Sequence, residues 1–399
     1  MAAATGAGTP REVLAVALKL GLTSFGGPIA HLGYFRREYV ERRRWLDERS
    51  FADLVALCQL LPGPASSQLG IAIGTRRAGL IGGIAAWLGF TAPSAIAMIG
   101  FAVLASSSDI ASAGWVHGLK LAAVAIVAQA VLLMAGTLAP DWPRRLVTIA
   151  ATVVALLWST PLTQVAVIIG GGVIGYVLLR APLPTDDVAE PATVSRRTGA
   201  VLLITFAALL VGLPLVAAAT GSLPVAQLEG FYRSGALVFG GGHVVLPLLQ
   251  SATVDPGWIG QGQFLAGYGA AQAVPGPLFT FAAYLGTVSI VAPAGWLGGL
   301  LCLGAIFLPS FLLIWGVMPF WARLRASESF RRALAGTGAA VVGLLAAALY
   351  NPVWTGSVNS IIDVAVAAAA LGLLFARLPP IVVVALCALA GQALTMWRI

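Results

Sequence analysis

The sequence Gln-x-x-Pro-Gly-Pro occurs twice inside apolar segments, and these two breaks limit the possible folds more than any other feature. The copies span residues 59–64 and 272–277. Each proline lacks an amide N–H and clashes with the preceding helical turn, while the glycine allows torsions closed to other residues. Each copy is therefore predicted to join two half-helices at a non-helical tip. The N-terminus of the second half-helix offers free N–H groups and a partial positive charge, which favour an anion.

The composition of the chain indicates a membrane protein. Hydrophobic residues make up 59% of the 399 residues and charged residues only 10%. A water-soluble protein of this length could not bury so much apolar surface, so lipid must surround most of it. Several runs reach the roughly 20 apolar residues that cross a bilayer. We therefore predict an all-α polytopic membrane protein, with the lipid bilayer as a partner.

The two halves of the chain repeat one another. The recurring groups are Phe25-Gly26-Gly27 with Phe239-Gly240-Gly241, Trp45 with Trp258, and Pro93-Ser94 with Pro309-Ser310. Matching order and nearly constant spacing indicate a duplication, which is common in transporters. We expect an N-terminal repeat at residues 1–180 and a C-terminal repeat at 225–399. Residues 181–224 are expected to form a cytoplasmic linker and one extra transmembrane helix.

Loop charge predicts that the two halves are inverted. Residues 36–49 carry six arginines, and Arg76-Arg77 follow the first tip, whereas the aligned loops 251–263 and 288–294 carry no Lys or Arg. Basic loops mark the cytoplasmic side. Agreement with all loops requires re-entrant segments at 11–35, 51–75, 229–249 and 263–287, and about four spanning helices per half. With the linking helix this gives nine crossings.

The alternative is that these four segments cross the membrane fully, which gives 13 crossings. The arginine-rich loop and Arg76-Arg77 would then lie on opposite faces, against the charge rule. Re-entrant hairpins in turn expose non-helical backbone at membrane depth, which is tolerated only inside protein or beside a wet cavity. The two pairs of hairpins are therefore expected to converge on a cavity near the midplane.

Lys19 and Arg233 are the candidate cations for an anion site. Ionisable residues inside apolar segments are costly and often functional. Each of the two lies six residues before a Phe-Gly-Gly run, so the duplication keeps a cation at the same point in both halves. We hypothesise that they balance the charge of a bound anion. The alternative is that their charged ends snorkel to the membrane surface.

The helix breaks supply uncharged candidates. Gly-rich turns let backbone N–H groups approach an oxyanion, glutamine amides donate without carrying charge, and hydroxyls follow both tips. The amides could instead satisfy broken backbone, and the hydroxyls could merely cap the half-helices. The expected substrate-binding residues are Lys19, Gly26, Gly27, Gln59, Pro62, Gly63, Pro64, Ser66, Ser67, Arg233, Gly240, Gly241, Gln272, Pro275, Gly276, Pro277 and Thr280.

Several other classes of function lack their motifs. The net charge of +8 comes from arginines in short loops beside apolar spans, which indicates membrane orientation and not nucleic-acid binding. The three histidines and three cysteines show no metal-ligand spacing, and a G-x-x-x-x-G-K-[ST] loop for ATP is missing. We expect no cofactor, no metal and no catalytic residues.

Longer motifs resemble the chromate ion transporter family in its long form with two fused halves. They are F-G-G-P (25–28), W-L-D-E-R-S-F-A-D-L-V-A-L-C-Q-L-L-P-G-P-A-S-S-Q (45–68), I-G-T-R-R-A-G (73–79), A-W-L-G-F-T-A-P-S (86–94), F-G-G-G-H-V-V-L-P (239–247) and Q-A-V-P-G-P-L-F-T (272–280). The resemblance covers essentially the whole chain. It implies an inner-membrane exporter of chromate, a tetrahedral dianion that sulfate resembles, driven by motive force.

The residues by themselves argue for an anion, and only the resemblance specifies chromate. The second half lacks the basic loop of the first, so substrate contacts need not be symmetric. Transport of sulfate or another inorganic anion is the alternative, and the coupling ion is open. A membrane-embedded enzyme or lipid-handling protein would need a catalytic cluster at one membrane face, and the sequence offers none. A homodimer is compatible with the sequence.

Overall fold

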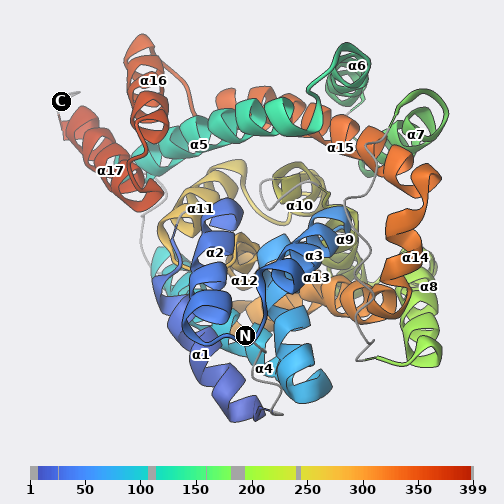
Figure 1. Ribbon diagram of the computed structural model, residues 1–399. Helices are drawn as coiled ribbons and strands as arrows, with labels where there is room; N and C mark the ends of the chain where they lie inside the picture. The colour runs from blue at the N-terminus through green and yellow to red at the C-terminus, as the bar shows by residue number, and fades with distance from the viewer. Residues whose placement is uncertain are drawn as a thin grey trace.

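The computed structural model describes residues 8–25, 27–106, 114–158, 160–180, 194–239 and 244–396, and over these ranges the protein is helical without strands (Figure 1). The first half contains α1 (Pro10–Thr23), α2 (Gly27–Phe35), the π-helix η1 (Arg36–Arg42), α3 (Glu48–Leu60), α4 (Ala65–Ser106), α5 (Gly114–Leu138), α6 (Trp142–Leu157) and α7 (Pro161–Leu178). A linking helix, α8 (Arg196–Thr220), follows. The second half contains α9 (Leu223–Leu237), α10 (Val245–Thr253), α11 (Gln261–Ala273), η4 (Leu278–Thr280), α12 (Phe281–Val288), α13 (Gly295–Val317), η5 (Met318–Phe320), α14 (Trp321–Ala326), α15 (Glu328–Ala348), η6 (Leu349–Trp354), α16 (Ile361–Phe375) and α17 (Pro380–Met396).

The two Pro-Gly-Pro segments form re-entrant hairpins. Trp45 precedes α3, and the guanidinium carbon of Arg77, after the first tip, lies 5.1 Å from the centre of its ring. At the aligned positions of the second half, the N–H of Ile290 donates to the carbonyl of Trp258 at 3.2 Å. Two half-helices in line would hold such pairs roughly 40 Å apart, at 1.5 Å per residue. Each segment therefore folds back so that its two ends lie together, which agrees with the re-entrant arrangement predicted from loop charge.

The chain folds back again after each hairpin. Helix α4 is interrupted at Ala78 and Gly79, which have non-helical torsions. A Cβ added to Gly74 would meet the backbone of Gly82, so the two arms of α4 lie in direct contact. The second half separates the same arms as α12 and α13, which approach closely at Gly286 and Gly298. Small residues allow this close contact between helix backbones.

The two halves exchange their last helix pairs. Helices α6 and α7 of the first half pack along α15, while α16 and α17 of the second half pack along α5. Hydroxyls reinforce the first contact, with Thr148 donating to the carbonyl of Ala339 at 2.9 Å and Thr152 to that of Gly343 at 3.2 Å. Figure 1 shows α5 and α15 as a continuous wall with one exchanged pair on each end.

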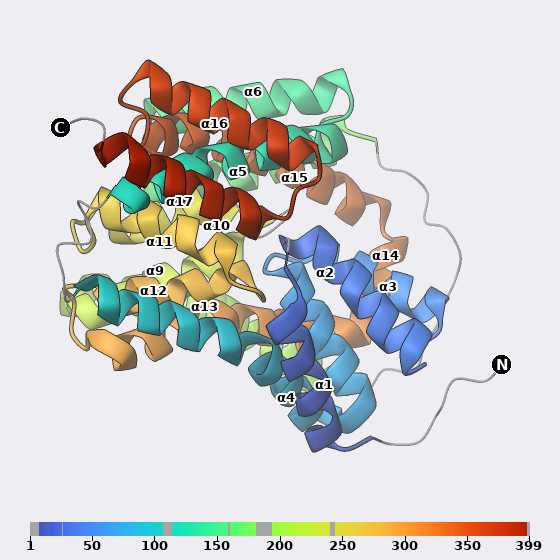
Figure 2. The ribbon, with the colours of Figure 1, turned by 90° about the vertical axis from the view of Figure 1, so that its left-hand side faces the viewer.

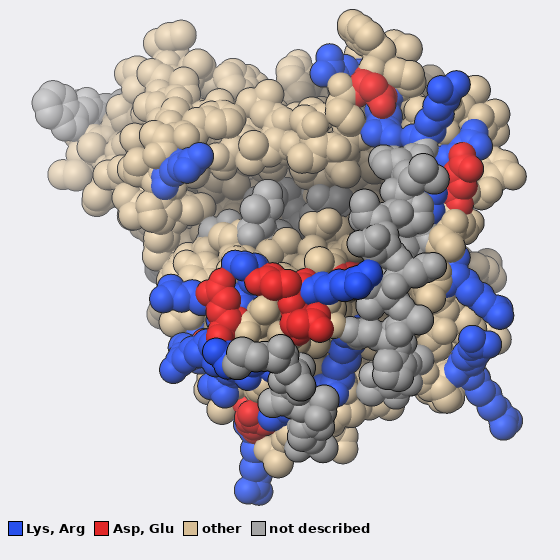
Figure 3. Space-filling model, viewed as in Figure 1, with Lys and Arg blue, Asp and Glu red and all other residues tan. Residues whose placement is uncertain are grey.

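The hairpins of the two halves open on opposite sides of the molecule. In Figure 2, α2 and α3 lie at the right, and the loops beside α11 lie at the left. Charged side chains gather over the N-terminal hairpins and the right-hand edge of Figure 3, while the upper left is almost uncharged. The opposite openings agree with the inverted halves that the arginine distribution predicted.

The apolar helices are consistent with a polytopic membrane protein. In the described part of the chain, five helices are long and apolar enough to cross a bilayer: α4, α5, α8, α13 and α15. Helices α7, α16 and α17 are apolar but shorter. Along α8 only Gly199 is buried, as expected for a helix surrounded by lipid. The number of nine crossings remains a prediction.

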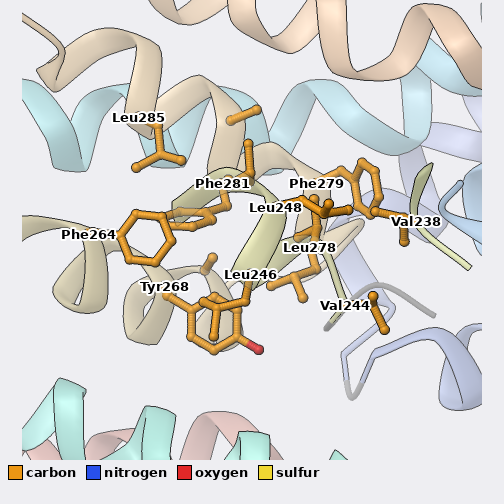
Figure 4. Packing of buried hydrophobic residues seen from close by; sticks show 14 of the residues in the cluster. Val238, Val244, Leu246, Leu248, Phe264, Tyr268, Leu278, Phe279, Phe281 and Leu285 are labelled. Atoms are coloured by element: carbon orange, nitrogen blue, oxygen red, sulfur yellow. The ribbon is translucent and has the colours of Figure 1, made fainter. Parts of the chain in front are cut away.

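An aromatic cluster fixes the second hairpin. Phe281 of α12 lies between Phe264 and Tyr268 of α11, with ring centres 5.1 and 5.8 Å apart (Figure 4). All three rings are buried. Offset or edge-on aromatic pairs add about 0.5–1.5 kcal/mol beyond the burial of their area. This cluster holds the two arms of the second hairpin, α11 and α12, against each other.

Single-cysteine labelling tests the re-entrant, inverted arrangement. The native cysteines Cys58, Cys302 and Cys387 are buried, so an impermeant thiol reagent should report introduced cysteines. We expect Arg42→Cys and Ala78→Cys to react from one membrane face and Gln263→Cys and Ile290→Cys from the other. Reaction of Ala78→Cys on the face opposite to Arg42→Cys would show that the segment crosses fully.

Candidate functional site

Each Pro-Gly-Pro tip is held by the helix break of the opposite half. The N–H of Gly63 donates to the carbonyl of Val238 at 2.6 Å, and the N–H of Gly276 donates to that of Ser24 at 2.9 Å. Val238 and Ser24 are aligned positions directly before the two Phe-Gly-Gly runs. The reciprocal bonds bring both tips and both breaks into the interface between the halves.

The central position of each tip requires a glycine. Gly63 and Gly276 have φ of +127° and +101°, a region that L side chains rarely adopt. A Cβ at Gly63 would lie 2.9 Å from Ser310 Oγ, and one at Gly276 would lie 2.9 Å from Ser94 Oγ. Each tip therefore faces a buried serine of the other half.

Ser94 and Ser310 were missed as site residues by the sequence analysis. The duplicated Pro-Ser pair was recognised only as a sign of the repeat, because nothing in the sequence indicates which helix faces a tip. A proline–serine pair kept in both halves inside an apolar helix is the signal that could have found them. The structure places both serines against the tips at aligned positions.

Buried polar atoms that have no partner among the described residues lie near both tips. Near the first tip they are Ser67 Oγ, Gln68 Oε1 and Ser310 Oγ, and near the second Ser24 Oγ, Thr91 Oγ1 and Gln272 Nε2. Most buried polar groups in proteins are hydrogen-bonded, since an unpaired one costs about 1–3 kcal/mol. These hydroxyls and amides could bind water or a polar ligand in the interface between the halves.

A histidine supports the break next to the second tip. His31 Nε2 lies 3.2 Å from the carbonyl oxygen of Ser24, which also accepts the Gly276 N–H. The ring of His31 meets Phe90 edge-on, with centres 5.3 Å apart. His31 is almost completely buried, and its Nδ1 has no partner among the described residues.

Other predicted residues stabilise the tips themselves. Thr280 Oγ1 donates to the carbonyl of Pro277 at 2.9 Å, which caps the turn after the second tip. Gln68 Nε2 donates to the carbonyl of Pro62 at 2.6 Å inside the first. Pro62, Pro64, Ser66 and Ser67 are buried, whereas Pro275 is half-buried.

The glycine runs are only partly described. Gly27 has φ of +76° and begins α2. Gly26, Gly240 and Gly241 lie outside the described residues, so their predicted contact with an anion stays a prediction.

The two glutamines have different surroundings. Gln59 is exposed and lines a cavity of about 260 Å³ together with Phe239, Arg144 and Arg331. Gln272 is half-buried, and its side chain lies beside that of Tyr268. The first tip therefore has a glutamine that faces an open space, and the second has one held within the protein.

Both predicted cations form ion pairs within their own halves. Lys19 Nζ lies 2.8 Å from Glu38 Oε2, and Arg233 Nε lies 2.6 Å from Glu229 Oε1. Glu229 lies four residues before Arg233, a spacing at which ion pairs form along one helix. Glu38 lies 19 residues after Lys19, in the arginine-rich loop, so its pairing with Lys19 could not be predicted from the sequence. The described contacts of these cations are with glutamates and not with the tips.

Glu38 collects several cations at the base of the first hairpin. Arg43 and Arg42 approach it at 2.8 and 3.3 Å, in addition to Lys19. Burial by itself would raise the pKa of Glu38, but hydrogen bonds from Lys19 and Arg43 outweigh it and lower the pKa to about 2. The carboxylate therefore stays ionised throughout the physiological range.

The family described as chromate transporter matches residues 11–176 and 225–392. A chromate transport protein of Pseudomonas aeruginosa is 30% identical over 84% of this chain and 79% of its own length. A probable chromate transport protein of Synechococcus elongatus is 29% identical over 83% and 81%, and a chromate transport protein of Cupriavidus metallidurans is 27% identical over 96% and 92%. No solved structure matches the chain.

The torsions of the tips predict the effect of adding a methyl group. Gly63→Ala and Gly276→Ala should each destabilise the protein by about 1–3 kcal/mol, because alanine strains these torsions and meets a serine hydroxyl. Gly304→Ala is the matched control, since its Cβ would have nothing within 4 Å. Thermal unfolding in detergent measures the difference. A Gly63→Ala protein as stable as Gly304→Ala would show that the tip is free to rearrange.

Acid pH should weaken the Glu38 cluster. Because folding lowers the pKa of Glu38, its contribution is complete above about pH 5 and is lost as the pH falls towards 2. Glu38→Gln should therefore lower the free energy of unfolding at pH 7. At pH 3 the difference in unfolding free energy between this variant and wild type should be smaller. Glu41→Gln, which removes an exposed ion pair with Arg36, should have little effect. An equal difference in unfolding free energy between Glu38→Gln and wild type at both pH values would contradict the lowered pKa of Glu38.

Proposed function

Because the chain belongs to the chromate transporter family, we propose that it is a secondary active exporter that binds chromate at the paired helix breaks near the membrane midplane. The observation that supports this site is the reciprocal bonding of the tips, from Gly63 to Val238 and from Gly276 to Ser24. Discontinuous helices that meet at the interface of two inverted repeats are the usual substrate site of secondary transporters.

A dianion needs fixed donors to replace its water at membrane depth. The N–H groups of Gly63 and Gly276 are engaged with the opposite half, so donation falls to the first turn of α4 and to nearby hydroxyls. The first N–H groups of a helix lack acceptors within that helix. Among the described residues, hydroxyls without partners lie beside both tips, from Ser67 and Ser310 at the first and from Ser24 and Thr91 at the second, so both tips have donors to offer.

The charge of the anion must also be balanced. Two helix N-termini supply about half a charge each, which leaves roughly one negative charge of a dianion. Lys19 and Arg233 each precede a break by five residues, about 7.5 Å along a helix, a distance that their long side chains can cover. In this proposal each cation leaves its glutamate for the anion, one in each access state.

Sulfate or another inorganic oxyanion is the alternative substrate. The groups around the tips are backbone N–H groups, hydroxyls and amides, which recognise a tetrahedral oxyanion by its shape and charge. Nothing among them coordinates chromium. The preference between chromate and sulfate therefore depends on how closely the spacing of these donors matches the size of each anion.

Transport by purified protein in liposomes tests the function and the charge balance together. Labelled chromate and sulfate should enter under an imposed ion gradient, with chromate preferred. Lys19→Gln and Arg233→Gln should each lower the rate of chromate transport at least tenfold, because part of the dianion is left unbalanced. Arg11→Gln, which removes an exposed cation from the first turn of α1, is the control.

Two results would contradict the proposal. Wild-type protein that moves neither anion under any gradient would overturn the transport function. Wild-type rate and KM in Lys19→Gln, Arg233→Gln and the double variant would overturn the charge balance and leave these residues as structural ion pairs. The direction is read from inside-out membrane vesicles, which an exporter should fill with chromate.

A further inference from the structure

A cavity lined by two arginines adjoins the first tip. Its volume is about 260 Å³, and its polar lining comes from Gln59, Thr137, Arg144 and Arg331. Gln59 and Leu60 are the last residues of α3 before the tip, and Phe239 follows Val238, whose carbonyl holds Gly63. The cavity is therefore lined by residues next in sequence to the first tip and to the break that holds it.

The exchange of helix pairs brings the two arginines together. Arg144 lies in the first turn of α6, in the first half of the chain, and Arg331 in the first turn of α15, in the second half. Because α6 packs along α15, the two guanidinium groups line one cavity although 187 positions separate them in the sequence. In the sequence both arginines lie in short basic stretches beside apolar runs, and nothing there shows that the two meet.

The ionisable groups that line the described part of the cavity are both cations. Arg144 donates to the carbonyl of Arg180 at 3.0 Å and lies 3.6 Å from a carboxylate oxygen of Asp141, while its buried Nε has no partner among the described residues. The described lining contains two guanidinium groups, one amide and one hydroxyl, with no carboxylate. By contrast, the cleft around Lys19 is also lined by Glu38 and Glu41.

We propose that this cavity is the site where a tetrahedral oxyanion dianion first binds and loses part of its water before it reaches the first tip. The inference rests on the proposed transport function. Guanidinium groups pair with oxyanions through two parallel hydrogen bonds and are weakly hydrated, so two of them on one cavity wall suit a tetrahedral oxyanion. Loop charge assigns this end of the protein to the cytoplasm, and Gln59 lies between the cavity and the tip.

Kinetics of the arginine variants test the site. Arg144→Gln and Arg331→Gln should each raise the KM for chromate roughly tenfold, and the double variant more, because each loses a charged hydrogen bond. The kcat should change little, since the tips are intact. The increase should appear when chromate is supplied at the cytoplasmic face, in inside-out vesicles, and not in right-side-out vesicles.

The neighbouring arginines provide a matched control. Arg145 donates to the carbonyls of Ala139 and Pro140, and Arg332 to those of Leu179 and Val177. The double variant Arg145→Gln/Arg332→Gln removes the same charge from the same helical turns without touching the cavity, and should keep the wild-type KM. Equal effects of the two double variants would overturn the proposal, because general surface charge would then explain both.

A binding measurement separates this proposal from the transport function. Chromate or sulfate should raise the melting temperature of wild-type protein in detergent, and at a given anion concentration the shift should be clearly smaller in Arg144→Gln/Arg331→Gln but unchanged in the control double variant. If the melting temperatures changed in this way while the wild-type protein transported neither anion, the cavity would be confirmed as an anion site and the transport function would be overturned. An unchanged KM and an unchanged shift in a transporting protein would overturn the cavity site alone.

Discussion

The structure depends on how an interrupted helix satisfies its backbone inside a membrane. Lipid offers no partner for an N–H or C=O that a proline or glycine has released from a helix. Here the released groups of one half find partners in the other, because Gly63 bonds Val238 and Gly276 bonds Ser24. Each half therefore completes the other, and the breaks that would be costly in isolation become the contact at the centre of the protein.

Much of this arrangement could be predicted from the sequence. The duplicated Pro-Gly-Pro located the tips, and arginines in only one of two aligned loops gave the inversion and favoured re-entrant segments. Both features can be recognised from short stretches of sequence, because proline interrupts a helix wherever it occurs and arginine-rich loops remain on the cytoplasmic side of a membrane. The contact of Arg77 with Trp45 and its counterpart at Ile290 and Trp258 agree with these predictions.

The contents of the site were harder to predict, because they depend on contacts between halves. Sequence position could not reveal that Ser310 faces Gly63, or that Lys19 pairs with Glu38. It suggested cations before the breaks, where the duplication was visible, and passed over Arg144 and Arg331, which have no aligned copies. A repeat identifies what the two halves share, whereas a binding site also uses residues that only one half has.

The exchanged helix pairs also affect how the protein is made. Thr148 of α6 bonds Ala339 of α15, so a partner of the first half is synthesised 191 residues later. Contacts this distant in sequence form late and leave earlier segments without their final neighbours during synthesis. While the ribosome completes the chain, α6 and α7 must wait in the bilayer beside lipid or the insertion machinery, and the first half cannot reach its final packing until the second has arrived.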